Sequence, residues 1–346
     1  MCHRTTICLI CCLGSLSAQI DSSLAQTPFR VQTDVVQVPV SVTDRSGRNI
    51  DGLVARDFAV LDDGFPLEVA LDAFGRGSAP ISMVIAIQTS GISTPTLGKI
   101  RRIGGMIQPL VIGLRGEAAV LTFDGEIAWR QDFTSDDISI RQAVNNLKPG
   151  TAVKQARMLD AIAAVADRMK ERKGRRVLLL ISENRDRGSE TTFQQALESV
   201  MREGIEVFGA HYSPYSMTWI ADSKDLPHVS SSQITANDPS AGPDSAPAGL
   251  DLLAIFAELP RLGQINMVQA LTEATGGSDY PFVKERGVEA AIEKLGVEVH
   301  SQYILSFPRH QNATGLHQID VSVPNRRDFL IRWRRGYSVN QISETH

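Results

Sequence analysis

The segment at residues 81–87 is apolar on both faces of a strand, and it constrains the fold more than any other feature of the sequence. A strand with one face in solvent carries polar residues at every second position, whereas a strand covered by helices on both sides is apolar throughout. A second wholly apolar segment lies at 177–181, another strand is expected at 205–210, and helical periodicity separates them. The sequence therefore predicts an α/β fold with a doubly wound, mostly parallel sheet.

A small β segment precedes this domain. Valines occupy every second position from 36 to 42, as in a strand with one buried face. Pro39 lies among them and predicts an edge strand, because proline cannot donate a ladder hydrogen bond. Asp63-Gly64 then predicts a hairpin turn. The segment is too short to bury much apolar surface by itself.

The end of the chain repeats this β character. A helix is expected at 289–295, followed by strands at 301–307, 315–323 and 329–337. Because each terminal segment is too small alone, we expect the two to join into one accessory β unit, with the α/β domain inserted between them. The predicted boundaries are 29–76 for the N-terminal β segment, 79–285 for the α/β domain and 286–340 for the C-terminal segment.

Several local signals refine the α/β domain. Thr94-Pro95 predicts the start of a helix whose buried face runs from Leu97 to Val111, and Ser135 predicts the N-cap of another. The basic run at 170–176 is expected to be a solvated helix end. Residues 213–249 are rich in Ser, Pro, Ala, Gly and Asp, which predicts a mobile surface insertion before helices at 250–259 and 267–275.

Residues 1–25 have the pattern of a secretory signal peptide, with cleavage after Ala18 or Ala25. The apolar run within them is too short for a stable transmembrane helix, and lipidation at Cys11 is a weaker alternative because no small residue precedes it. We therefore expect a periplasmic or secreted protein without a transmembrane segment. All four cysteines lie in this leader, so the mature chain would hold no thiol. Its net charge of -4 gives no general attraction for nucleic acid.

Polar residues gather where the predicted strands end. In a doubly wound sheet, ligands bind at the carboxyl ends of the strands, where the strand order reverses. Three loops fall at this edge, at residues 88–93, 150–151 and 182–186, and all of them carry oxygen-bearing side chains. The sequence thus predicts a binding face here, although Ser90 and Thr151 would serve equally as helix caps or turn residues.

The chain resembles the von Willebrand factor A fold and, more closely, the bacterial VWFA-related family named for its abundance in Acidobacteria. The resemblance covers nearly the whole mature chain. The segments that carry it are VVQVPVSVTDRSGRNIDGLVARDFAVLDDG, PISMVIAIQTSG, LTFDGEI, LKPGTAVKQARMLDAI, RVLLLISENRDRGS, SQYILSFP and IRWRRGYS.

This resemblance implies a metal-ion adhesion site, in which Asp-x-Ser-x-Ser, a distant Thr and a distant Asp bind Mg²⁺ and a partner's carboxylate completes the coordination. The pattern falls on Gln88, Ser90, Ile92, Thr151 and Glu183. Ser90 and Thr151 match; the other three do not, and one carboxylate and one hydroxyl are lost. We therefore expect no metal cofactor, or only weak Mg²⁺ or Mn²⁺ binding with Asp124 or Asp186 as substitute ligands. Both a metal-free binding face and a structural remnant stay open.

Other catalytic signals are absent from the sequence. The histidines, His317 among them, have no metal-ligand spacing, and no motif pairs a nucleophile with a base. We expect a non-enzymatic interaction module for a protein partner. The alternatives are a divalent-cation-dependent hydrolase or phosphotransfer enzyme built on Asp124, Glu183 and Asp186, a scaffold without an active site, and recognition by the 213–249 insertion.

Overall fold

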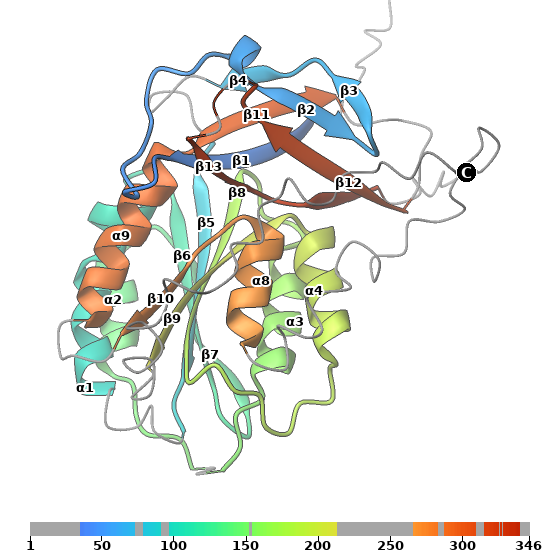
Figure 1. Ribbon diagram of the computed structural model, residues 1–346. Helices are drawn as coiled ribbons and strands as arrows, with labels where there is room; N and C mark the ends of the chain where they lie inside the picture. The colour runs from blue at the N-terminus through green and yellow to red at the C-terminus, as the bar shows by residue number, and fades with distance from the viewer. Residues whose placement is uncertain are drawn as a thin grey trace, which may run out of the picture. The chain divides into compact units, whose positions relative to one another are not determined.

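The computed structural model describes residues 35–72, 79–90, 97–151, 154–212, 266–282, 287–308, 315–324, 326 and 328–339 (Figure 1). The predicted leader at 1–25 lies outside these residues, as do the insertion at 213–249 and the helix expected at 250–259. Ile92 and Thr94-Pro95 also lie outside them.

A six-stranded sheet forms the centre of the α/β domain, in the order β10-β9-β8-β5-β6-β7. Neighbouring strands are parallel except β6 and β7, which are antiparallel. This confirms the predicted doubly wound, mostly parallel sheet, with an antiparallel strand at one edge. The strands are β5 (Ile81–Gln88), β6 (Glu117–Phe123), β7 (Ile127–Thr134), β8 (Arg175–Ser182), β9 (Ile205–Tyr212) and β10 (Asp279–Phe282).

Helices cover both faces of this sheet, which explains why residues 83–87 of β5 are all apolar. Met83 and Ile85 of β5 belong to the core under α1, α2 and α9, whereas Val84 and Ala86 belong to the core under α3, α4 and α8 (Figure 1). All eight residues of β5 are buried. The helices are α1 (Leu97–Ile100), α2 (Asp137–Asn145), α3 (Met158–Met169), α4 (Phe193–Arg202), α8 (Met267–Thr275) and α9 (Gly287–Ser301).

The helix expected along 97–111 is broken into pieces, although its predicted face is buried. α1 passes into a 3₁₀ helix (Arg101–Gly105) and then a π-helix (Gln108–Ile112). A Cβ on Gly104 would lie 3.1 Å from Cα of Arg141, so this glycine permits close packing on α2. Pro109 has no N–H for a regular helical hydrogen bond.

The N-cap of α2 is Asp136, and the prediction of Ser135 is wrong. The Asp136 carboxylate accepts hydrogen bonds from the N–H groups of Ile138 and Ser139, at 3.2 and 3.1 Å. A carboxylate at this position also interacts favourably with the positive end of the helix dipole.

Two four-stranded sheets form the accessory β unit, in the orders β13-β1-β11-β4 and β14-β12-β2-β3. Each contains strands from both ends of the chain, which confirms the predicted accessory unit, and their inner faces share one apolar core. The strands from the first half are β1 (Val35–Thr43), β2 (Ala59–Asp62), β3 (Phe65–Leu67) and β4 (Ala70–Asp72). Those from the second half are β11 (Tyr303–Pro308), β12 (Gly315–Ser322), β13 (Leu330–Trp333) and β14 (Gly336–Val339).

The prediction that β1 is an edge strand is wrong, because β1 lies between β13 and β11. Its pairing with β13 covers only Val40 to Thr43, so β13 ends before it reaches Pro39. Pro39 pairs with Ile304 of β11 on the other side. The missing N–H of the proline is therefore tolerated inside the sheet, because no β13 residue faces it.

The prediction of one strand at 329–337 is also wrong, because these residues form parts of two strands, β13 and β14, which lie in different sheets. Between them, the N–H of Arg335 donates to the carbonyl of Ala274 and its carbonyl accepts from the N–H of Ile319. These two hydrogen bonds hold the chain where it passes from one sheet to the other.

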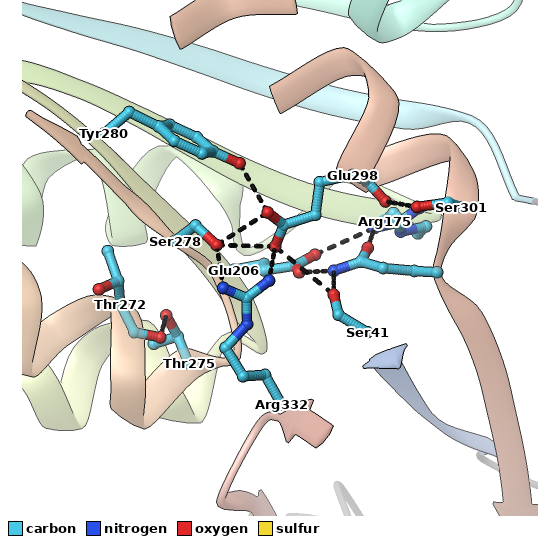
Figure 2. A network of polar contacts seen from close by, with 11 residues as sticks. Ser41, Arg175, Glu206, Thr272, Thr275, Ser278, Tyr280, Glu298, Ser301 and Arg332 are labelled. Atoms are coloured by element: carbon cyan, nitrogen blue, oxygen red, sulfur yellow. Dashed lines mark hydrogen bonds and ion pairs between the residues drawn. The ribbon is translucent and has the colours of Figure 1, made fainter. Parts of the chain in front are cut away.

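A buried polar network connects the α/β domain to the accessory unit (Figure 2). Arg175 at the start of β8 forms an ion pair of 3.0 Å with Glu206 of β9, and both also bond to the Gln302 side chain before β11. Gln302 in turn donates to Ser41 of β1 at 3.2 Å. Burial raises the pKa of Glu206, and the Arg175 guanidinium opposes this rise. The expectation that the run 170–176 is a solvated helix end is therefore wrong for Arg175.

Glu298 of α9 is the centre of the other half of this network (Figure 2). Its carboxylate accepts from the hydroxyls of Ser278 and Tyr280, at 2.8 and 2.6 Å, and from the Arg332 guanidinium of β13 at 2.6 Å. Burial and the Glu298 charge raise the pKa of Tyr280, so its hydroxyl stays a donor. The second half thus connects α9 and β10 with a strand of the accessory unit.

Candidate functional site

Gln88 bridges two of the three predicted loops. Its side-chain carbonyl accepts a hydrogen bond of 2.9 Å from the N–H of Glu183, and its amide donates to the carbonyl of Ser90 at 3.3 Å. The side chain is fully buried at the end of β5, beside the end of β8. These neighbouring strands are where the strand order of the sheet reverses. The structure thus brings Gln88, Ser90 and Glu183 together, as the sequence predicts.

The two residues that match the adhesion pattern have different surroundings. Ser90 is buried, and its hydroxyl donates to the carbonyl of Gln155 at 2.5 Å, which joins the first loop to the segment between the second loop and α3. Thr151 is exposed, and the described contacts give it no role in holding the loops. Ile92 lies outside the described residues.

Glu183 forms an ion pair with Arg187, in which the carboxylate and guanidinium are 3.2 Å apart. The Glu183 side chain is 2% exposed, whereas that of Arg187 is 39% exposed. Arg187 is fixed from its backbone, which exchanges two hydrogen bonds with Ala156. The guanidinium therefore places a positive charge against the carboxylate of Glu183, one of the residues on which the adhesion pattern falls.

Asp124 is buried beside the second loop. One of its carboxylate oxygens accepts from the N–H of Glu126 at 2.8 Å. The other lies against Gly150, where an added Cβ would be only 2.0 Å away, so the approach depends on glycine. Backbone bonds from Gly150 to Thr89 and from Arg157 to Asp124 hold the surrounding turns.

Asp186, the second proposed substitute ligand, is part of the start of α3. Its Oδ1 accepts from the N–H of Leu159 at 3.0 Å and from the Ser189 hydroxyl at 2.6 Å. Asp186 therefore satisfies a free N–H of a helix terminus. No local pattern in the sequence indicates this cap, because Asp186 lies 27 positions after Leu159.

Asp160 anchors the same region. Burial acts to raise the pKa of Asp160, but hydrogen bonds from Thr191 and from the Arg157 guanidinium outweigh it and lower the pKa to about 2. The carboxylate is 2.8 Å from the N–H of Thr191 and 2.7 Å from Nε of Arg157. It therefore stays ionised at neutral pH and holds the loop after β8 against α3.

The donor set fits Mg²⁺ poorly. Mg²⁺ requires several oxygen ligands in near-octahedral geometry and gives up its waters reluctantly. Here the Gln88 carbonyl accepts from a backbone N–H, the Ser90 hydroxyl is used by a carbonyl, and the Glu183 carboxylate already faces a guanidinium. No step of a mechanism is therefore assigned to a metal at this face.

The described residues contain no helix long and apolar enough to cross a membrane. No family model matches the chain, and no curated protein matches it either.

Among solved structures, the chain is similar to an aerotolerance-related membrane protein from Bacteroides fragilis carrying multiple mutations to serine, with 18% identity, coverage of 63% of this chain and 99% of that one, and a TM-score of 0.41. The chain is also similar to the conserved hypothetical protein BatB from Bacteroides thetaiotaomicron, with 14% identity and a TM-score of 0.41. That match covers 63% of this chain and 98% of BatB. A third similar structure is proximal thread matrix protein 1 from the mussel byssus, with 9% identity and a TM-score of 0.43. That match covers 67% of this chain and 49% of the mussel protein. Likenesses this distant assign no function.

Proposed function

We propose that this chain is a non-enzymatic protein-interaction module of the bacterial VWFA-related type that acts outside the cytoplasm. Its binding face is the carboxyl end of the six-stranded sheet, formed by the loops of Gln88, Ser90, Thr151 and Glu183, which we call the A-type face. The observation that carries the proposal is the bridge from the Gln88 carboxamide to the Glu183 N–H and the Ser90 carbonyl.

This bridge supports a face that keeps its shape without a cation. In the adhesion pattern, a metal ion joins the loops after two neighbouring strands, and here one neutral side chain joins the same loops. A carboxylate at position 88 could accept the Glu183 N–H but could not donate to the Ser90 carbonyl. An amide is therefore the better residue for a metal-free arrangement.

Arg187 gives this face a chemical preference. Its guanidinium is anchored by Glu183 and is still partly exposed, so it can bind a carboxylate of the partner by charge-assisted hydrogen bonds. We propose that it replaces the metal as the group that a partner's acidic side chain contacts.

The hydrolase alternative has no such support. It needs at least two acidic side chains that converge on one point. The Asp186 carboxylate caps α3, one Asp124 oxygen is bonded within its own turn, and Glu183 is paired with Arg187.

Thermal melts test the metal-free reading. We would melt the mature chain in EDTA, Mg²⁺, Mn²⁺ or Ca²⁺, beside a variant carrying Gln88→Asp, Ile92→Ser and Glu183→Asp. A ligand that binds only the folded state raises its stability. We expect the natural chain to ignore Mg²⁺ and the variant to respond. If Mg²⁺ stabilises the natural chain but not one carrying Gln88→Ala, the A-type face binds metal and our reading is wrong.

Partner capture from the extracytoplasmic fraction of the host tests the binding role. The immobilised mature chain should retain the same partner in EDTA and in Mg²⁺. Arg187→Glu should abolish retention, whereas Arg202→Glu, an exposed arginine at the end of α4, should not. A partner that both variants retain equally would contradict the assignment of the face.

A further inference from the structure

Three side chains with metal-ligand chemistry meet in the accessory β unit, far from the A-type face. Asp62 ends β2, Asp63 begins the turn to β3, and His317 lies on β12. Asp63 and Gly64 both have positive φ, at 50° and 83°, which suits the tight two-residue hairpin predicted from the sequence. The turn places two successive carboxylates beside one imidazole.

The facing atoms of this Asp-Asp-His cluster are close together. Nδ1 of His317 is 2.7 Å from an oxygen of Asp63 and 3.8 Å from an oxygen of Asp62. One ligand atom from each residue lies within 4.8 Å of the other two. The side chains of Asp62 and His317 are 3% and 8% exposed, and that of Asp63 is 27% exposed. The cluster is therefore nearly buried, with one side open to solvent through Asp63.

Each carboxylate of the cluster is held in place by the oxygen that does not face His317. The Tyr337 hydroxyl donates to Oδ2 of Asp62 at 2.7 Å, and the N–H of Gln318 donates to Oδ1 of Asp63 at 2.8 Å. The imidazole stacks on the Tyr337 ring, with centroids 5.0 Å apart. Metal ligands are oriented by outer hydrogen bonds of this kind. The remaining oxygens are thereby aimed at Nδ1.

Within the described residues, the polar contacts of the His317 ring are made by Nδ1, which faces Asp62 and Asp63. Nε2 of His317 is buried and makes no hydrogen bond within the described part of the chain. His317 is thus a nine-tenths buried side chain whose polar contacts all point into the pair of carboxylates.

We propose that Asp62, Asp63 and His317 bind a divalent transition-metal ion of the zinc type. An imidazole nitrogen with carboxylate oxygens suits Zn²⁺, Co²⁺ or Mn²⁺ better than Mg²⁺ or Ca²⁺, which prefer oxygen alone. The ion takes the place of the proton between Nδ1 and Asp63. When His317 is an imidazolium, its Nδ1 proton leaves for solvent and Nε2 keeps its proton; when His317 is neutral, its single proton sits on Nε2 in the bound form. In both cases the Nδ1 lone pair binds the metal, and water fills the remaining coordination positions.

Metal titration of the mature chain tests this site directly. We would measure Zn²⁺ binding by calorimetry and Co²⁺ binding by visible absorption, at pH 6 and pH 8. We expect one site per chain and tighter binding at pH 8, because a protonated imidazole must lose its Nδ1 proton before it can bind the metal, and protonation is more frequent at pH 6. Asp63→Asn, which keeps the size of the side chain, and His317→Gln should each weaken binding at least about ten-fold.

Tyr337→Phe should also weaken binding, by about ten-fold or more, because it frees the Asp62 carboxylate. Asp328→Asn, an exposed acid of the same β unit, should leave affinity unchanged, and so should the triple variant of the A-type face. Circular dichroism would confirm that each variant is folded. The proposal is overturned if the folded natural chain binds neither Zn²⁺ nor Co²⁺. It is also overturned if folded Asp63→Asn and His317→Gln bind the metal as tightly as the natural chain does.

Discussion

Arg175 and Glu206 form an ion pair with side chains that are only 7% and 4% exposed, and Gln302 bonds to both of them. The pair joins the start of β8 to β9, and Gln302 extends it to the accessory β unit. Removal of one partner from such a pair leaves an uncompensated buried charge.

Glu206→Ala should therefore reduce the free energy of unfolding by about 3–5 kcal/mol. Urea denaturation of the chain measures this value. Glu198→Ala, on the exposed face of α4, should change it by less than about 0.5 kcal/mol. Equal losses in the two variants would show that the Arg175–Glu206 pair does not stabilise the fold.

Gln88→Ala removes the bridge between the loops and leaves the N–H of Glu183 without its acceptor. We expect a loss of about 1–3 kcal/mol in the free energy of unfolding, which is the cost of an unsatisfied buried donor. Gln142→Ala on the exposed side of α2 is the control and should be nearly neutral. If Gln88→Ala leaves the free energy of unfolding unchanged, water or a neighbouring group must replace the amide as the acceptor for the Glu183 N–H.

Asp160→Asn should give a pH-dependent loss of stability. The pKa of Asp160 in the folded chain is about 2, below the ordinary value of 3.8, so its contribution is complete above about pH 4 and is lost as the pH falls through about 2. At pH 7 the variant should be less stable by about 2 kcal/mol. The free energies of unfolding of the natural chain and of Asp160→Asn, measured from pH 7 to pH 2, should therefore become similar at the acid end.

The matched control for Asp160 is Glu190→Gln, because Glu190 is 92% exposed and its ion pair with Arg157 is long, at 3.9 Å. It should change stability by less than about 1 kcal/mol at every pH. A constant gap between the natural chain and Asp160→Asn down to pH 2 would exclude ionisation as the cause.

Asp136→Ala should cost about 1 kcal/mol of stability because α2 loses its N-cap. Ser135→Ala should be nearly neutral, since the hydrogen bond found at Ser135 uses its backbone carbonyl. Thermal melts of the two variants decide between the residue that caps α2 in the structure and the one that the sequence favours.

The sheet was predictable from the sequence because burial on both faces leaves a direct pattern. The central residues of β5 (83–87) and β8 (177–181) are apolar without a break, and the positions of both strands follow from these runs. The contact between the Gln88 and Glu183 loops was predictable for the same reason, since carboxyl ends of parallel strands share one edge.

Other features depend on residues that are distant in the chain. The Asp-Asp-His cluster joins Asp63 to His317 across 254 positions, and no spacing rule indicates such a pair. Asp186 caps a helix that begins before it in the sequence, so local capping signals do not identify it. Pro39 was misleading because its tolerance depends on where β13 ends.

The interleaving of the two chain ends in both accessory sheets has a kinetic consequence. Val36 pairs with Phe307, and Val40 pairs with both Tyr303 and Trp333, so β1 must wait for strands made more than 260 residues later. Such distant pairings require costly loop closure and form slowly unless the intervening chain is already compact. The α/β domain should therefore fold first and bring the ends together, which leaves the valine-rich β1 as the segment most exposed to aggregation in a newly made or refolding chain.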